Sequence, residues 1–140
     1  MAEYIQKAVG GDLFRIETKA DYPDDYYQCI DVAKQEMNAD ARPELVAYLD
    51  DISEYDNIFI CGPCWWGVFP MAVNSLTDRL DFTGKKVMGA VTHEGSGFGN
   101  CEGKLKKELT GARFGKGLAI HGADAAKSEA QVAEWAKAQA

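Results

Sequence analysis

Three short runs of the chain are apolar at successive positions, so that both faces of a strand formed there would be apolar. They are residues 57–61 (NIFIC), 86–91 (KVMGAV) and 117–121 (GLAIH). Strands of a parallel sheet have this pattern because helices cover the sheet on both sides. The runs therefore predict buried strands of a parallel sheet.

Helix-forming stretches lie between and after these runs. They begin at Met71 (MAVNSLTDRL), Cys101 (CEGKLKKEL) and Ser128 (SEAQVAEWAKAQ). Strand and helix thus alternate, which is typical of an α/β protein with helices on both faces of a parallel sheet. At 140 residues, the chain has the length of a single domain, and we expect residues 1–140 to form one.

The N-terminal third of the chain has a less regular pattern. Residues 12–19 (DLFRIETK) mix apolar and charged positions, which favours a strand at the edge of a sheet. Helices are expected on both sides of this segment, the last of them opened by a proline in its first turn. They comprise residues 2–9, 24–37 and 43–52.

The net charge of −7 and the pI of about 4.8 argue against nucleic acid and against an anionic membrane as partners. The same charge suits a protein that docks on a basic partner. We expect no secretory signal, because residues 1–4 carry no basic and apolar leader pattern, and no apolar run is long enough to span a bilayer. Four cysteines in such a chain are expected to be free thiols, and a cytoplasmic location is expected with them.

Two loops are expected to share one edge of the sheet. Residues 61–70 (CGPCWWGVFP) follow the first apolar run, and residues 92–100 (THEGSGFGN) follow the second. Ligands of open α/β sheets bind beyond the carboxyl ends of the strands. A ligand site is therefore predicted between these loops.

The spacing of Cys61 and Cys64 in CGPC permits a redox dithiol of the thioredoxin type, which would make the protein a thiol oxidoreductase. A thioredoxin-like fold would place a proline opposite the dithiol, and no proline follows Pro70. We therefore expect the pair not to be catalytic. Cys61, Cys64, His93 and Cys101 also have the chemistry of a zinc site, but only one Cys-x-x-Cys pair has diagnostic spacing.

Trp65 and Trp66 cannot both point into a core from one loop, so at least one should line a pocket or the surface. The glycines of residues 95–99 would allow backbone N–H groups to approach a flat, carbonyl-bearing ring. The dinucleotide fingerprint G-x-G-x-x-G is not completed, because Asn100 stands at its sixth position. A planar aromatic ligand between the two loops is the favoured interpretation.

Residues 52–87 (ISEYDNIFICGPCWWGVFPMAVNSLTDRLDFTGKKV), continued by residues 92–100, resemble the bacterial flavodoxin-like proteins that bind flavin mononucleotide, FMN. The resemblance covers nearly the whole chain. It implies a flavodoxin-like parallel sheet in strand order 2-1-3-4-5, with FMN as the cofactor in its crevice. It also implies an electron carrier, or a related flavin-dependent oxidoreductase, with a basic redox partner.

The resemblance assigns the flavin ring to both loops. An aromatic side chain of the first loop would stack on the isoalloxazine ring, and the second loop would contact its pyrimidine edge. No catalytic acid or base and no metal ligand is implied. The cofactor-binding residues implied are Pro63, Cys64, Trp65, Trp66, Gly67, Thr92, His93, Glu94, Gly95, Ser96, Gly97 and Gly99.

The chain departs from that family at its N-terminal end. It has neither the first apolar strand nor the Ser/Thr/Gly-rich loop that holds the FMN phosphate, so it is expected to be an N-terminally truncated flavodoxin-like domain lacking its central strand. Weak flavin binding follows. If a strong preference for FMN over riboflavin nevertheless reveals a phosphate site, the candidates are Thr83 with Lys85 and Lys86, a neighbouring subunit, or residues N-terminal to residue 1. Sheet edges left open favour a homo-oligomer, most simply a homodimer. The alternative function is a non-catalytic scaffold that binds no flavin.

Overall fold

A computed structural model describes residues 1–140 and contains a parallel sheet. Strand β2 is central: β1 pairs with it on one side, and β3 and β4 pair with it in succession on the other. In register, Ile58 lies beside Val87 and Ala119 beside Val91. The strands are β1 (Asn57–Pro63), β2 (Lys86–His93), β3 (Arg113–Phe114) and β4 (Leu118–His121).

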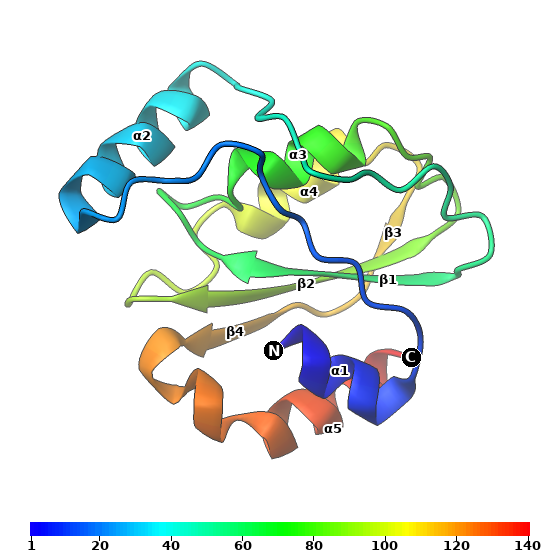
Figure 1. Cartoon of the computed structure of the whole chain (residues 1–140). Helices are drawn as coiled ribbons and strands as arrows, with labels where there is room; N and C mark the ends of the chain where they lie inside the picture. The colour runs from blue at the N-terminus through cyan, green and yellow to red at the C-terminus, as the bar shows by residue number, and fades with distance from the viewer.

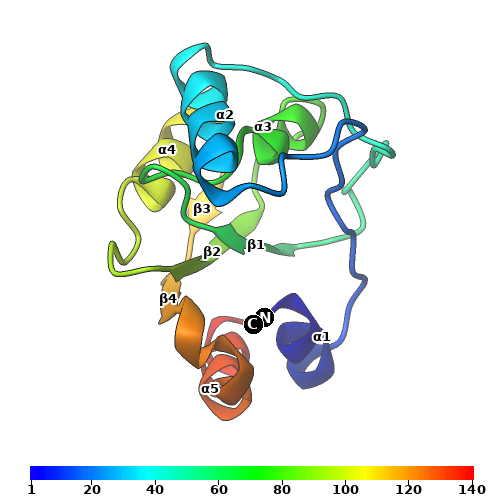
Figure 2. The ribbon, with the colours of Figure 1, turned by 60° about the vertical axis from the view of Figure 1, so that its left-hand side comes forward.

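Helices cover both faces of the sheet, as Figures 1 and 2 show. One face carries α1 (Ala2–Val9) and α5 (Glu129–Gln139), which pack against each other. The opposite face carries α3 (Met71–Thr77) and α4 (Cys101–Glu108), with α2 (Tyr26–Asn38) lying outside α3. A short 3-10 helix, η1 (Gly122–Lys127), joins β4 to α5.

The core lies on both sides of β2. Val87 and Val91 pack with the helices α3 and α4, whereas Met88 and Ala90 pack with α1 and α5, and all four are inaccessible to solvent. Full burial of one Val or Met side chain stabilises the fold by about 1.5–3 kcal/mol. The apolar run of residues 86–91 thus fixes the middle of the sheet, which confirms the predicted parallel architecture.

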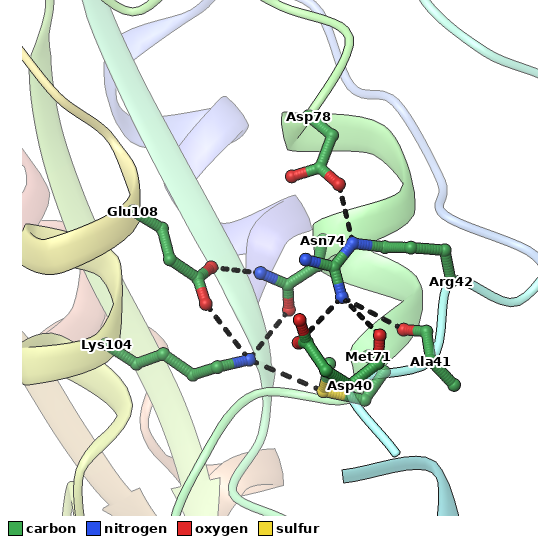
Figure 3. A network of polar contacts seen from close by, with 8 residues as sticks. All are labelled: Asp40, Ala41, Arg42, Met71, Asn74, Asp78, Lys104 and Glu108. Atoms are coloured by element: carbon green, nitrogen blue, oxygen red, sulfur yellow. Dashed lines mark hydrogen bonds and ion pairs between the residues drawn. The ribbon is translucent and has the colours of Figure 1, made fainter.

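A polar network joins α3 to α4 (Figure 3). The ammonium of Lys104 contacts Asn74 Oδ1 at 3.1 Å, Met71 Sδ at 3.4 Å and Glu108 Oε1 at 3.3 Å. The amide of Asn74, which is buried, also donates to Glu108. On the other side of α3, Arg42 donates to Asp78 at 2.5 Å. These contacts fix the helices that flank the carboxyl end of β1.

Two predictions about the N-terminal third are wrong. Residues 12–19 do not form a strand of the sheet, and residues 43–52 do not form a helix. The two segments instead contact each other: Lys19 N–H donates to Glu44 C=O at 2.9 Å, and Val46 N–H donates to Glu17 C=O at 2.8 Å. An extended segment becomes a regular strand only beside a partner, and these residues have no neighbouring strand of the sheet.

Strand β1 pairs only with β2, so its other side is an edge of the sheet. No strand occupies the place beside β1 where the sequence predicted a gap in the sheet. The predicted homo-oligomer stays a prediction. The remaining strands and helices match those expected to within a few residues. None of the helices combines the length and the apolar character needed to cross a bilayer.

Candidate functional site

The loops that follow β1 and β2 lie side by side at the carboxyl edge of the sheet. Cys64 N–H donates to Thr92 C=O at 2.8 Å. This bond extends the pairing of β1 with β2 by one residue beyond the end of β1. Asn100 N–H donates to Gly67 C=O at 2.5 Å and closes the contact further out. The two loops predicted to share a ligand site are therefore joined by backbone hydrogen bonds.

Residues 65–68 of the first loop form a tight turn. Trp65 N–H donates to Val68 C=O at 2.7 Å, and Val68 N–H donates back to Trp65 C=O at 3.1 Å. Both central residues have positive φ, 54° at Trp66 and 82° at Gly67, as in the type I′ turn of a hairpin. For a tryptophan this left-handed backbone costs about 1–2 kcal/mol, so the turn holds Trp66 in a strained position.

The second loop depends on glycine for its close approach to this turn. A Cβ atom built on Gly99 would lie 2.7 Å from the Gly67 Cα atom, and Gly99 has φ of 52°. Gly97, with φ of 63°, is also left-handed but faces open space. Gly99 is therefore required for contact between the loops, whereas Gly97 is required only for its left-handed backbone conformation.

The two tryptophans point in different directions. The Trp65 ring meets the Tyr22 ring edge to face, with 5.1 Å between centroids. Trp66 lies against α2, where its Nε1–H donates to Ile30 C=O at 3.0 Å and the Lys34 ammonium lies 5.0 Å from its ring centroid. Trp66 is 45% exposed. Both indoles thus lie outside the main core clusters, where the sequence had required this of at least one.

A cavity of about 320 Å³ opens between the first loop and the N-terminal third of the chain. Of the predicted site residues only Pro63 and Trp65 line it. The other lining residues were not foreseen, because they lie far from the loop in the sequence. They are Arg15, Ile16, Glu17, Thr18, Asp21, Tyr22, Pro70 and Ala72.

Burial and a carboxylate shape the far wall of this cavity. The Tyr22 hydroxyl donates to Glu36 at 2.7 Å, and burial together with this carboxylate raises the pKa of Tyr22. Tyr22 therefore remains a neutral phenol and holds its ring against Trp65. The Tyr22 and Trp65 rings thus form an aromatic part of the lining beside the charged Arg15, Glu17 and Asp21.

The polar residues predicted in the second loop lie on its outer side. His93 Nδ1 accepts from Gly95 N–H at 2.9 Å, and the His93 ring meets that of His121 at 5.5 Å between centroids. The carboxylate of Glu94 lies against Gly122. The Ser96 hydroxyl donates to Gly97 C=O at 3.2 Å. These contacts shape the loop toward η1 rather than toward Trp65.

Backbone donors of the second loop are free. The N–H groups of Ser96, Gly97, Phe98 and Gly99 donate to no acceptor in the protein. They lie in a chain of alternating left-handed glycines, which exposes backbone instead of side chains. Such donors suit the carbonyl oxygens of a planar ligand.

The thiols of CGPC do not form a thioredoxin-like centre. Cys61 lies within β1 and not at the start of a helix, and burial raises the pKa of its thiol to about 11. The Cys64 thiol donates to Phe98 C=O at 3.6 Å, and burial raises the pKa of Cys101. No group of three or more His, Cys, Asp or Glu side chains is arranged to hold a metal ion.

The suggested phosphate ligands lie at the wrong end of the sheet. Thr83 and Lys85 precede β2, and Lys86 is its first residue. The two loops of the candidate site follow the last residues of β1 and β2, at the opposite edge of the sheet. Lys85 binds Ser53 C=O at 3.2 Å, and Lys86 binds Gln139 C=O at 2.6 Å. A strand of this length spans roughly 20 Å. These side chains therefore cannot complete a site at the carboxyl edge.

A flavodoxin family model matches residues 1–139. The solved structure of a suspected flavoprotein from Bacteroides uniformis is 31% identical, with a TM-score of 0.83, over 97% of this chain and 87% of that one. A second, from Bacteroides eggerthii, is 29% identical, with a TM-score of 0.81, over 99% and 87%. No curated protein matched the chain.

A more distant structure contains a flavin. It is a flavoprotein from Lactobacillus acidophilus in complex with FMN, 22% identical to this chain, with a TM-score of 0.69 over 90% of this chain and 86% of that one. At this identity the likeness shows a shared fold.

Proposed function

Because this chain belongs to the flavodoxin family, we propose that it binds a flavin, FMN in the first instance, at the carboxyl edge of its sheet and transfers electrons through it. The observation that supports this most strongly is the contact between the two loops. The turn at Trp65 presents an aromatic side chain, and the glycine-rich loop that is bonded to this turn carries free backbone donors. These are the groups that a planar ring bearing carbonyls requires.

The residues present fit a flavin ring. Trp65 and Tyr22 would supply stacking surface, while the N–H groups of residues 96–99 would donate to the carbonyl oxygens of the ring. Glycine at position 99 leaves no side chain between the loops. When bound, the flavin supplies the redox chemistry. The protein binds the ring, orients it and limits its contact with water, and no side chain is needed as acid or base.

No corresponding fit is found for a phosphate group. The only basic side chain that lines the cavity is Arg15, which is largely exposed and lies 3.9 Å from Glu17. FMN and riboflavin are therefore expected to bind this chain with similar, weak affinity. Two lost charge-assisted hydrogen bonds correspond to about 3–6 kcal/mol, or roughly two to four powers of ten in the dissociation constant.

The redox partner is expected to be basic. The chain carries a net charge of −7, and five acidic side chains occur in residues 21–36, next to the proposed site. Complementary charge speeds association and orients the partner, more than it increases affinity. A cytoplasmic location is part of the same proposal, and it is supported by four cysteines that form no disulfide.

Fluorescence titration of FMN and of riboflavin tests the proposal. Replacing Trp65 and Trp66 together by alanine should weaken binding at least tenfold, because stacking on one aromatic side chain contributes about 1–3 kcal/mol. Tyr26→Ala is the matched control, since Tyr26 is a 70% exposed aromatic residue that does not line the cavity. Unchanged affinity in the folded double variant would remove the tryptophans from the site.

One observation favours the alternative function of a scaffold without flavin. The outer edge of β1 has no partner strand, as in proteins that associate through a sheet edge. If neither flavin binds at millimolar concentration, the scaffold becomes the better description.

A further inference from the structure

Two of the four thiols lie together, and they are not the two that the CGPC spacing pairs. The Cys64 thiol donates to Phe98 C=O at 3.6 Å, and the same oxygen accepts the Cys101 N–H at 2.9 Å. Cys101 belongs to the core cluster on the α3 and α4 face of the sheet, and Cys64 packs against that cluster. Cys61 packs on the opposite face, with Ile5. The structural neighbour of Cys64 is therefore Cys101.

The two neighbouring thiols differ in their exposure to solvent. Cys64 is partly exposed, whereas Cys101 is only 1% exposed. Burial and, after it, hydrogen bonding with the Cys64 thiol raise the pKa of Cys101. A reagent that arrives from solvent therefore meets Cys64 first, and Cys101 is reached through Cys64.

The pair connects two elements of the candidate site. Cys64 joins β1 to the turn of residues 65–68, and Cys101 is the first residue of α4. Between these elements the backbone contact is the bond from Asn100 N–H to Gly67 C=O at 2.5 Å. A covalent bond between Cys64 and Cys101 would close the chain around residues 65–100 and hold the turn against α4.

We propose that Cys64 and Cys101 are a redox-sensitive pair, which a low-molecular-weight disulfide converts into an intramolecular disulfide that locks the turn of residues 65–68 onto α4. The structure represents the reduced state of this pair, in which all four cysteines are free. This inference does not depend on flavin binding.

The reaction is a thiol–disulfide exchange in two steps. In the first step, the Cys64 thiolate attacks one sulfur of the small disulfide, forms a mixed disulfide and releases one small thiolate. In the second, the Cys101 thiolate attacks the Cys64 sulfur, breaks the mixed disulfide and releases the other. The two protein thiols thereby lose two electrons and two protons. The small disulfide gains both pairs and leaves as two thiols.

The surroundings give each cysteine its own role. Cys64 is the attacking residue, because it is the more exposed of the two. Cys101 is the resolving residue, and its burial slows the second step because the reactive form is the thiolate. The ammonium of Lys104, one turn further along α4, opposes the rise in the pKa of Cys101 and so favours that thiolate.

Peptide mapping after oxidation tests the proposal. The reduced, folded chain is incubated with oxidised glutathione, its remaining thiols are alkylated, and it is digested with trypsin. Residues 35–79 and residues 87–104 should be recovered as one cross-linked peptide, which dithiothreitol separates. Because residues 35–79 contain both Cys61 and Cys64, the mapping is repeated in Cys61→Ala, where the cross-link should persist.

Thermal unfolding measures the lock. A disulfide that closes a loop of this length should raise the midpoint of thermal unfolding by roughly 10 °C over that of the reduced chain. Dithiothreitol should remove the increase. The same oxidation of Cys64→Ala should leave the midpoint unchanged, because the exposed partner is absent.

Three variants separate the roles of the thiols. Cys101→Ala should stop after the first step and retain one glutathione on Cys64. Cys64→Ala should form neither the cross-link nor a mixed disulfide at Cys101. Cys29→Ala is the matched control, because Cys29 is a partly exposed cysteine of α2, and it should cross-link at the rate of the unchanged chain.

Four results would overturn the proposal. A disulfide between Cys61 and Cys64 would show that the CGPC spacing, and not the fold, selects the pair. A cross-link that forms only in urea would show that the folded chain keeps the two thiols apart. Recovery of Cys64 and Cys101 as free thiols at millimolar oxidised glutathione would make them plain core residues. An unchanged unfolding midpoint in the cross-linked chain would show that the bond does not lock the turn.

Discussion

Gly99→Ala tests the contact between the two loops of the proposed site. The new methyl group would lie 2.7 Å from Gly67 Cα and 3.0 Å from Gly67 O. Both atoms are backbone, so no side-chain rotation can relieve the clash. Overpacking of this kind costs about 1–3 kcal/mol. The left-handed backbone of residue 99 adds about 1–2 kcal/mol.

Gly97→Ala is the matched control for Gly99→Ala. Its φ of 63° is close to the 52° of Gly99, but a Cβ atom at position 97 has nothing within 4 Å. Gly97→Ala should therefore be destabilised only by the cost of placing alanine in a left-handed backbone, which is about 1–2 kcal/mol. Both substitutions restrict the unfolded chain equally, so that contribution cancels in the comparison. The difference between the two variants measures the loop contact alone.

Urea unfolding followed by circular dichroism is the assay. Gly99→Ala should lower the free energy of unfolding by about 2–5 kcal/mol and Gly97→Ala by about 1–2 kcal/mol. With a denaturant dependence of about 2 kcal/mol per molar, the midpoints should differ by roughly 0.5–1.5 M. Equal midpoints would show that the loops are not in contact in solution, and the proposed ring site would lose its basis.

Three further predictions concern the phosphate, the helix network and a thiol. FMN should bind less than a hundredfold more tightly than riboflavin in fluorescence titrations, and a larger ratio would reveal a phosphate site outside the residues considered. Asn74→Ala should lower the free energy of unfolding by about 1–3 kcal/mol, because Lys104 and Glu108 lose a buried partner, whereas the exposed Tyr26→Ala should leave it unchanged. Burial raises the pKa of Cys61 from about 9 to about 11. The neutral thiol's contribution to the free energy of unfolding is therefore fully present below pH 9 and is lost as the pH rises to 11. Unfolding measured at pH 8 and pH 10.5 should show a smaller loss in Cys61→Ala, and identical losses would contradict a buried neutral thiol.

The strands of the sheet could be predicted from sequence because a strand that is buried on both faces has apolar residues at consecutive positions. Residues 87–91 are apolar at every position, and the structure buries all five of them. The order of strand and helix along the chain then gives the position of the loops. Both ring loops were placed at the correct edge for this reason.

Residues 12–19 and 43–52 were mispredicted because their conformation depends on what lies beside them. The pattern of DLFRIETK suits a strand, yet a strand also needs a neighbour that bonds to it. The cavity shows the same limit. Arg15, Thr18 and Tyr22 lie more than forty positions from Pro63, and no spacing in the sequence links them. Only the folded chain brings them to one wall.

Helix α2 has a consequence for the timing of events at this edge of the sheet. It buries only Ala33 and is held mainly by Trp66, through Ile30 and Lys34, and by the bond from Tyr22 to Glu36. Such contacts contribute about 0.5–1.5 kcal/mol each. Together they allow the helix to detach in roughly one molecule in ten to one in a thousand while the sheet stays folded. Each detachment frees the Trp66 indole from Ile30 and Lys34, so changes in Trp66 emission would record the opening of α2.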